Sequence, residues 1–237
     1  MCTVSILPLG DGFRVMSNRD ERRDRAVALA PRVETFGTRS VIMPIDPVGG
    51  GSWIGVNDAG LAAALLNRHR GPRPITGSCS SRGAIVGRAL SFDSLAAAVT
   101  SVRELDATRF QPFSLVLVQQ REIVLIASDS REVGHAASTL ERPHMFTASS
   151  LGDFFVAAPR RRLFDCLMDH GGDRLRGQSL FHRHQWTDKR AISVLMERDD
   201  AATVSRTTVD VDQRGVALEY ESLIPCRPAQ KIELQSC

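Results

Sequence analysis

The sequence predicts an α+β domain in which two largely antiparallel sheets pack together, with helices outside them. Strand-like runs occur in pairs separated by short turns, and helix-like runs also occur in pairs. Paired strands are typical of antiparallel sheets, whereas strands that alternate with single helices would predict a parallel sheet. No linker rich in Pro, Gly or Ser divides the 237 residues, and a chain of this length can bury one large core. We therefore expect a single domain over residues 1–237.

The chain opens with a predicted β-hairpin. Residues 3–9 and 13–17 are short β-type runs, and Gly10-Asp11-Gly12 between them is a strong turn signal. This hairpin carries Cys2 at its free end. Further strands are expected at residues 39–43, 53–56, 61–66, 113–119, 122–127, 203–211 and 216–222.

Helices are predicted where apolar residues recur at a spacing of three and four. This pattern occurs at residues 81–89, 94–105, 159–170 and 188–198. Ser91 or Asp93 can cap the second of these helices. The loop Gly49-Gly50-Gly51-Ser52 lacks the lysine and the glycine spacing of a phosphate-binding loop, so we expect it to border the entrance of a site instead.

The composition of the chain excludes several classes of function. The net charge is +3 at neutral pH, which is too small to imply nucleic-acid binding. No run reaches the roughly 20 apolar residues that span a bilayer, and no signal segment opens the chain. We therefore expect a cytoplasmic protein without an integral membrane segment. Nothing in the sequence indicates its oligomeric state.

The cysteines and histidines form no recognisable disulfide or metal pattern. Five cysteines is an odd number, and none belongs to a Cys-x-x-Cys pair. His170, His182 and His184 have no acidic or thiol residue at ligand spacing around them. We expect no disulfide framework, no metal site and no organic cofactor.

Cys2 is the strongest candidate for chemistry. Removal of Met1 would give this one residue both a thiol and a free α-amine. The amine titrates at about pH 7.7 to 8.0 and the thiol near about pH 8.5, so proton transfer between them costs little. A nucleophile that carries its own base is the basis of N-terminal-nucleophile catalysis. The alternative is that Cys2 is a small apolar residue at the start of a buried strand.

A polar tetrad, Asn18-Arg19-Asp20-Glu21, follows the opening hairpin, which returns it toward Cys2. A guanidinium such as that of Arg19 lowers the pKa of a nearby thiol, and a carboxylate such as that of Asp20 can hold the α-amine. Adjacent side chains on an extended chain face opposite ways, so both can reach Cys2 only if the backbone turns between Ser17 and Glu21. We expect that turn. The alternative is a solvated, charge-rich turn without a catalytic role.

Asn67 follows the predicted strand at residues 61–66. The amide of an asparagine can donate to a developing oxyanion, which makes Asn67 a candidate for stabilising a tetrahedral intermediate. The alternative is that Asn67 only ends the strand or forms a turn.

Four segments together resemble the NRDE family, which includes the transport and Golgi organisation protein two-like proteins. The segments are Met1-Cys2-Thr3, Asn18-Arg19-Asp20-Glu21, Gly50-Gly51-Ser52-Trp53-Ile54-Gly55-Val56 and Gly60-Leu61-Ala62-Ala63-Ala64-Leu65-Leu66-Asn67. The family is in turn similar to the cysteine-type N-terminal-nucleophile amidases. This resemblance implies a four-layer αββα sandwich.

The same resemblance implies roles for individual residues. Cys2 would be the nucleophile, Arg19 and Asp20 its polar support, and Asn67 an oxyanion donor. Arg206, in Thr203-Val204-Ser205-Arg206-Thr207, matches the position of a second active-site arginine. Ser149 or Ser150 stands where the amidases carry another asparagine, so either one of them replaces it as an oxyanion or substrate-binding residue or that donor is missing.

Two functions follow from this resemblance. The first is a cysteine amidohydrolase or acyltransferase that acts on a small-molecule amide without a cofactor. The second is a non-catalytic protein of the same fold that binds or carries a lipid or haem. Fold alone does not decide between an enzyme and a carrier.

Overall fold

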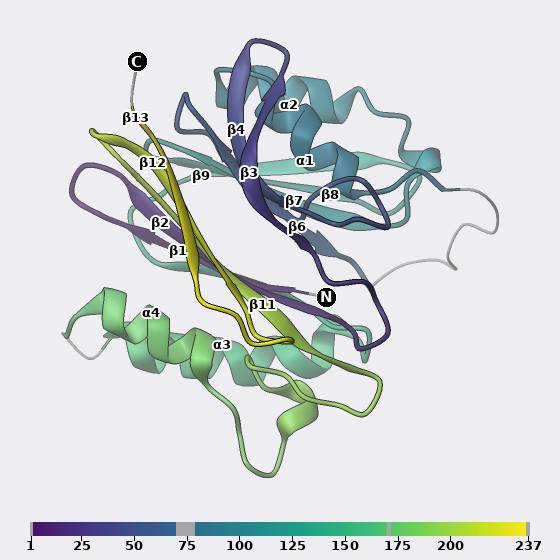
Figure 1. Ribbon diagram of the computed structural model, residues 1–237, viewed down its shortest axis with the longest axis vertical. Helices are drawn as coiled ribbons and strands as arrows, with labels where there is room; N and C mark the ends of the chain where they lie inside the picture. The colour runs from purple at the N-terminus through teal and green to yellow at the C-terminus, as the bar shows by residue number, and fades with distance from the viewer. Residues whose placement is uncertain (1, 70–78, 170–171, 236–237) are drawn as a thin grey trace.

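Two antiparallel sheets face each other in the computed structural model, which describes residues 2–69, 79–169 and 172–235 (Figure 1). In spatial order, the first sheet consists of β10 (His144–Ala148), β1 (Cys2–Pro8), β2 (Phe13–Arg22), β11 (Ala201–Asp212), β12 (Gly215–Ser222) and β13 (Gln230–Gln235). The second consists of β3 (Leu29–Phe36), β4 (Arg39–Ile45), β5 (Ile54–Asn57), β6 (Ala62–Asn67), β7 (Phe113–Gln119), β8 (Glu122–Ser128) and β9 (Val133–Thr139).

Helices cover the outer face of each sheet, so the chain forms the expected αββα sandwich. The helices are α1 (Gly83–Leu90), α2 (Leu95–Arg103), α3 (Asp153–Asp169) and α4 (Arg174–Arg183). Figure 1 shows α1 and α2 over the second sheet and α3 and α4 under the first. No helix in the described ranges is both long and apolar enough to cross a bilayer.

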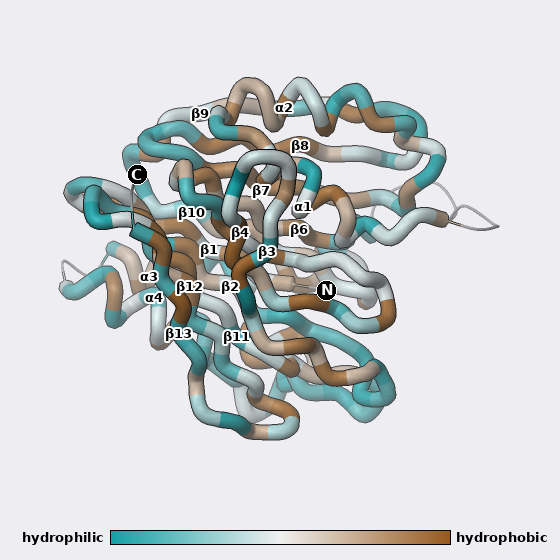
Figure 2. The backbone as a smooth tube through the Cα atoms, turned by 45° about the horizontal axis from the view of Figure 1, so that its top comes forward, coloured by the Kyte–Doolittle hydropathy of each residue, from teal (hydrophilic) through white to brown (hydrophobic). Residues whose placement is uncertain are grey.

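The core between the sheets follows from the alternation of side chains along the strands. Val4 and Ile6 of β1 face inward and pack in one cluster with Trp53 and Val56 from the second sheet. Hydrophobic stretches run along the strands of both sheets, and hydrophilic residues are frequent in the peripheral loops (Figure 2). Burial of this apolar surface is the main force that holds the two sheets together.

The helix-facing side of β1 carries the buried hydroxyls of Thr3 and Ser5, and Arg160 of α3 forms a hydrogen bond with the first of them. Its guanidinium donates to the hydroxyls of Thr3 and Thr147, each at 2.7 Å. It also donates to the carbonyls of Ile192 (3.1 Å) and Ser193 (2.6 Å). One buried side chain therefore fastens α3 to the first sheet by two hydrogen bonds and to the segment at Ile192 and Ser193 by two more.

His182 of α4 occupies a similar position further along β1. One ring nitrogen lies 2.7 Å from the Ser5 hydroxyl, and the other lies 2.9 Å from the amide oxygen of Asn18. The Asn18 amide nitrogen donates to the carbonyls of His182 and Val194, each at 2.9 Å. Asn18, the first residue of the tetrad, thus has a role in joining α4 to the sheet.

The predicted helix at residues 188–198 is wrong. Only Arg190–Ile192 form a 3₁₀ turn, and the residues after it form bends and one isolated β-bridge at Glu197, with Val194 and Met196 buried. This segment covers α4 and supplies the carbonyls that Arg160 and Asn18 bind. Its buried apolar residues, Val194 and Met196, lie two positions apart, a spacing that does not fit one face of a helix.

The capping residue of α2 also differs from the expectation. Ser94, rather than Ser91 or Asp93, is the N-cap, and its hydroxyl accepts from the backbone N–H of Ala97 at 3.3 Å. The opening hairpin, the strand pairs and the first two helices lie where the sequence predicts them, within a few residues.

Candidate active site

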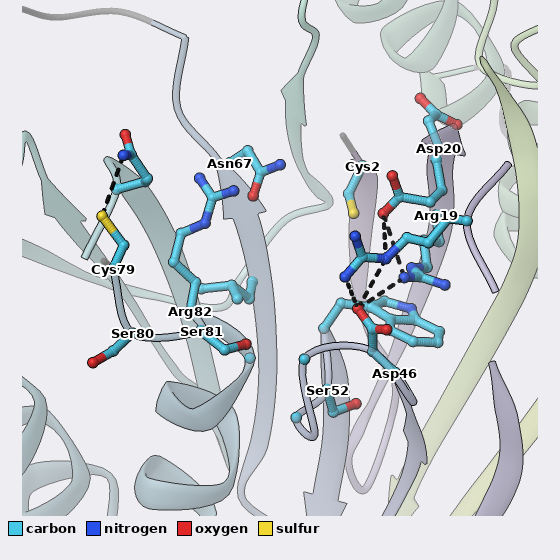
Figure 3. Close-up of a pocket in the computed structure, with 18 residues that line it drawn as sticks. Cys2, Arg19, Asp20, Asp46, Ser52, Asn67, Cys79, Ser80, Ser81 and Arg82 are labelled. Atoms are coloured by element: carbon cyan, nitrogen blue, oxygen red, sulfur yellow. Dashed lines mark hydrogen bonds and ion pairs between the residues drawn. The ribbon is translucent and has the colours of Figure 1, made fainter. Parts of the chain in front are cut away.

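Cys2 faces the space between the two sheets at the start of β1 (Figure 3). It is opposite Arg19 on β2 and opposite Ala148 on β10. The side chain borders a cavity of about 410 Å³ and is only 5% exposed. Burial raises the pKa of the Cys2 thiol above its usual range and outweighs the lowering effect of Arg19. Met1 lies outside the described residues.

Arg19 lies on the same face of the first sheet as Cys2, because the two residues are directly paired. Its guanidinium carbon lies 4.1 Å from the centre of the Trp53 ring, which belongs to the second sheet's side of the cavity. The same guanidinium is 3.3 Å from Asp46 and 3.4 Å from Glu21. A cation over an indole ring between two carboxylates is held in a defined position.

Asp20 points to the opposite face from Arg19, so the expected turn between Ser17 and Glu21 is wrong. β2 continues unbroken to Arg22. The pairing of β2 with β11 is irregular instead, because its register shifts between Thr203 and Ser205. The Thr203 hydroxyl donates to Asp20 at 2.6 Å. Burial raises the pKa of the Asp20 carboxyl, although the charge of nearby Arg160 opposes this.

Asp20 nevertheless borders the cavity that contains Cys2. β1 begins at Cys2, whereas β2 extends three residues beyond the position that pairs with it. The end of β2 is therefore not covered by β1 at this edge. Figure 3 shows Asp20 and Arg19 beside Cys2, on neighbouring positions of one strand.

Asn67 lies across the cavity from Cys2, at the end of β6 in the second sheet (Figure 3). Within the described part of the chain its side chain has no hydrogen-bond partner. An asparagine amide that borders a cavity without a protein partner is free to donate to a ligand. The structure thus brings Cys2, Arg19, Asp20 and Asn67 to one cavity.

Arg206 and the two serines lie elsewhere. Arg206 pairs with Glu221 on the helix-facing side of the first sheet, where it borders a different hollow. The backbone N–H of Ser149 donates to Asp153 at 2.9 Å, and its hydroxyl accepts from the N–H of Leu151, so Ser149 shapes the start of α3. The Ser150 hydroxyl accepts from Arg198 at 3.2 Å. None of the three borders the cavity of Cys2.

The cavity also contains charged residues that the sequence analysis did not single out. Arg25 donates to Asp46 at 2.5 Å and lies 3.5 Å from Glu21. Together with Arg19 they form an ion cluster of two arginines and two carboxylates, and hydrogen bonds from Arg25 and Val48 hold the pKa of Asp46 below its usual value despite burial. Of Glu21, Arg25 and Asp46, only Glu21 could have been placed here from the sequence. It lies two residues from Arg19 on the same strand, so the two side chains share a face.

The glycine-rich loop borders the cavity through Gly49, Gly51 and Ser52, as expected. It packs directly against the start of α1, where the Ser52 N–H donates to the Gly83 carbonyl at 3.2 Å. A Cβ atom on Gly51 would lie 2.3 Å from the carbonyl carbon of Gly83. Only glycine permits the two backbones to come this close.

A second cavity, of about 600 Å³, adjoins the first at Asn67. Its lining is mostly apolar and includes Leu125, Phe146, Ala148 and Ala157. Ala148 is the residue that pairs with Cys2 on β10. An ionic cavity and an apolar cavity therefore meet close to the thiol.

His182 is not available as a metal ligand. Both ring nitrogens of His182 are occupied by Ser5 and Asn18, and burial lowers the pKa of His182 to about 3. No group of three or more His, Cys, Asp or Glu side chains with metal-site geometry occurs among the described residues. His170 lies outside them.

The match to a known family extends over most of the chain. The model of the family described as Transport and Golgi organisation 2 (TANGO2) matches residues 9–208. The chain belongs to this family. The resemblance of its NRDE tetrad and flanking segments to that family is thereby confirmed. Comparison of this TANGO2-family chain with curated protein sequences gives no significant match.

Solved structures show the fold of this TANGO2-family chain at low sequence identity. Penicillin V acylase from Agrobacterium tumefaciens is 14% identical, with a TM-score of 0.64 over 99% of this chain and 86% of that one. A mutant of conjugated bile acid hydrolase from Clostridium perfringens is 12% identical, with a TM-score of 0.56 over 99% and 92%. The Caenorhabditis elegans ortholog of N-acylethanolamine-hydrolyzing acid amidase is 12% identical, with a TM-score of 0.56 over 87% and 92%. The fold is therefore that of the N-terminal-nucleophile hydrolases.

Proposed function

We propose that this protein is a cysteine amidohydrolase or acyltransferase of the N-terminal-nucleophile type, acting on a small-molecule amide. The observation that carries the proposal is that Cys2 and Asn67, from opposite sheets, border one cavity with Arg19 beside the thiol. A nucleophile and an amide donor that has no partner among the described residues lie on facing walls, which leaves room for a carbonyl between them. The solved structures of similar fold include enzymes named as an acylase, a hydrolase and an amidase, which supports the same class of reaction.

The reaction would begin with removal of Met1, which gives Cys2 a free α-amine. Because burial raises the pKa of the thiol, the thiol is protonated at neutral pH and needs a base. The α-amine takes the thiol proton, and the sulfur adds to the amide carbonyl. The Asn67 amide donates to the oxyanion that forms.

The second half of the reaction returns the enzyme to its starting state. The α-ammonium gives its proton to the leaving amine as the carbon–nitrogen bond breaks, and the acyl group remains on Cys2 as a thioester. Water, activated by the α-amine, adds to the thioester, and the thiol is released with the free acid. An amine in place of water would make the protein an acyltransferase.

The two adjoining cavities fit the two halves of an amide. The apolar cavity of about 600 Å³ suits an acyl group, and the ionic cavity of about 410 Å³ suits a polar amine half. They meet at Asn67, the proposed oxyanion donor, which is where the carbonyl would lie.

Intact-mass measurement and two substitutions test this proposal. The purified protein should lack Met1, and a panel of N-acyl amides with different acyl and amine halves should contain substrates. Cys2→Ala should abolish turnover, and Asn67→Ala should lower it by roughly 10² to 10³, the loss typical of one oxyanion donor. Cys226→Ala, which changes an exposed cysteine, should leave turnover unchanged. Retention of Met1, or equal turnover by Cys2→Ala, would contradict the proposal.

A non-catalytic lipid-binding protein is the second candidate, and the apolar cavity is the observation that favours it. Haem fits this cavity less well, because Met145 is the sole described residue on its lining with a common axial donor atom. A carrier would bind a fatty acid equally well with Cys2→Ala and would turn over no amide. An enzyme would show turnover that depends on Cys2.

A further inference from the structure

The cavity wall across from Cys2 carries an arginine without a carboxylate partner. Arg82 precedes α1, and its guanidinium donates to the carbonyl of Pro112 at 3.0 Å. A guanidinium has five donors, so most of them remain available. All aspartates and glutamates of the sequence lie within the described ranges, and none of them forms an ion pair with Arg82.

The other two arginines of this cavity differ from Arg82 in this respect. Arg19 and Arg25 are both paired with Glu21 and Asp46, so their charges are balanced within the ion cluster. The remaining carboxylate on the lining, Asp20, accepts from Thr203 and lies near the charge of Arg160 on the other side of the sheet. Arg82 is therefore the one arginine among the described residues of the lining that forms no ion pair, although it feels the more distant charge of Glu21.

The position of Arg82 is unfavourable for the free protein. It is the N-cap of α1, and the first turn of that helix has no acidic residue. The positive end of the helix dipole repels a cation at this place. Burial also lowers the pKa of Arg82, although a negative charge on Cys2 would raise it, which places the two side chains within electrostatic reach across the cavity. A bound anion would offset both the repulsion from the helix dipole and the cost of burying the Arg82 charge.

A second donor beside Arg82 points to the same kind of ligand. Ser81 borders the cavity, and among the described residues its hydroxyl has no hydrogen-bond partner. Figure 3 shows Ser81, Arg82 and Asn67 on one wall, facing the wall that carries Cys2. This wall presents donors and no carboxylate.

We propose that Arg82 and Ser81 bind a carboxylate on the amine half of the substrate. The proposal rests on the proposed amidase function for its assignment to the amine half, because the acyl half takes the apolar cavity. A planar guanidinium can bind a carboxylate through two parallel hydrogen bonds, which fixes its position as well as its charge. The substrate class is then an amide formed between an apolar acid and an amino acid.

Alkylation of Cys2 by two reagents that differ in charge tests the subsite without any substrate. Iodoacetate carries a carboxylate and iodoacetamide does not. The ratio of the iodoacetate rate to the iodoacetamide rate at Cys2 therefore reports the electrostatic potential that the opposite wall creates. Arg82→Gln should lower this ratio about fivefold, the effect of one partly exposed charge pair. Arg82→Lys should retain most of the ratio. Arg88→Gln, which removes an exposed charge from the same helix, should leave it unchanged.

The ratio separates anion binding from a role in thiolate stabilisation. If Arg82 only favoured the Cys2 thiolate, Arg82→Gln would slow both reagents equally. An unchanged ratio would overturn the proposed subsite. Rates are measured by peptide mass spectrometry on the full chain.

A second measurement does not depend on the reactivity of Cys2. In ¹⁵N-labelled protein, the Arg82 Nε–H resonance, assigned by its loss in Arg82→Gln, should shift on addition of butyrate and not of its neutral isostere 2-pentanone. Absence of a butyrate shift overturns the subsite even if amide turnover depends on Cys2. A shift with an unreactive Cys2 supports the subsite and contradicts the proposed nucleophile.

Discussion

His182 shows how the first sheet binds a titratable side chain in the neutral state. The ring is fully buried, and Ser5 and Asn18 occupy both of its nitrogens. Protonation would place a charge where burial is costly and where Arg206 and Arg160 add repulsion. Burial and these charges lower the pKa of His182 to about 3.

We predict that His182 makes stability depend on pH in acid. The unfolded chain binds a proton at this residue below about pH 6.5, whereas the native state does not until about pH 3. Its contribution to stability is therefore present above about pH 6.5 and is lost as the pH falls, at up to about 1.4 kcal/mol per pH unit.

Urea unfolding of wild type and His182→Gln between pH 7 and pH 4 measures this contribution. The substitution should flatten the decline in the free energy of unfolding, while His135→Gln, at an exposed position, should not. The proton resonance of the His182 ring should not titrate above pH 4. Equal slopes for all three proteins would contradict the assigned pKa.

At the same scale, the sequence reveals the residues of the site that have a chemical signature. Cys2 was predicted from its place in the chain, and Arg19 and Asn67 from their places at strand ends. Asp46 and Arg82 could not be found in this way, because they reach the cavity from loops whose course depends on how the sheets pack. Arg206 matches the position of an active-site arginine in the sequence, yet the alternation of side chains along β11 places it on the helix-facing side of the sheet.

Among the elements, the contact between the glycine-rich loop and α1 sets the width of the cavity. Gly51 and Gly83 approach backbone to backbone, and Arg82 directly precedes the helix that Gly83 begins. The loop also precedes Trp53, on which Arg19 rests. The loop and helix therefore position groups on both walls.

We predict that Gly51→Ala destabilises the protein by about 1 to 3 kcal/mol, the usual cost of overpacking. The new Cβ would meet the Gly83 backbone at 2.3 Å, so either the loop or the start of α1 must move. Gly10→Ala is the matched control, because nothing lies within 4 Å of its Cβ position. Thermal unfolding followed by circular dichroism gives both values. Equal melting temperatures for the two variants would show that the loop moves without cost and would contradict the prediction.

The sequence did not reveal β3, β9, β10, β13 or α4, and three of these elements show why. β9 is almost wholly exposed at the edge of the second sheet, so it has no apolar alternation. β13, at the edge of the first sheet, has no buried residue, and only Ile232 and Leu234 are half-buried. α4 contains few apolar residues, since it is fixed to the sheet by polar contacts from Gln178 and His182. Hydrophobic periodicity cannot detect segments that are held by hydrogen bonds.

At the scale of the whole molecule, the site depends on the alignment of layers. Cys2 and Arg19 come from the first sheet, whereas Asn67, Asp46 and Trp53 come from the second sheet and its loops. The inter-sheet core holds these two groups in register. The helix layer beneath the first sheet acts on the site less directly, through Arg160.

We predict that Arg160→Leu costs about 3 to 5 kcal/mol of stability, the range seen when one member of a buried charged network is removed. Two hydroxyls and two carbonyls would lose their donor, and the buried Asp20 would lose the nearby positive charge. Arg162→Leu, on the exposed side of the same helix, should change stability by less than about 0.5 kcal/mol. Urea unfolding compares the two, and a loss below about 1 kcal/mol for Arg160→Leu would contradict this account.

The stacking of Arg19 on Trp53 gives the molecule an optical reporter. The chain has two tryptophans, and Trp186→Phe would leave only the one that borders the cavity. The emission of an indole changes with the position of a cation above it and with the water around it. Fluorescence of that single-tryptophan protein would thus reveal a compound entering beside Cys2 before its identity as substrate or cargo is known.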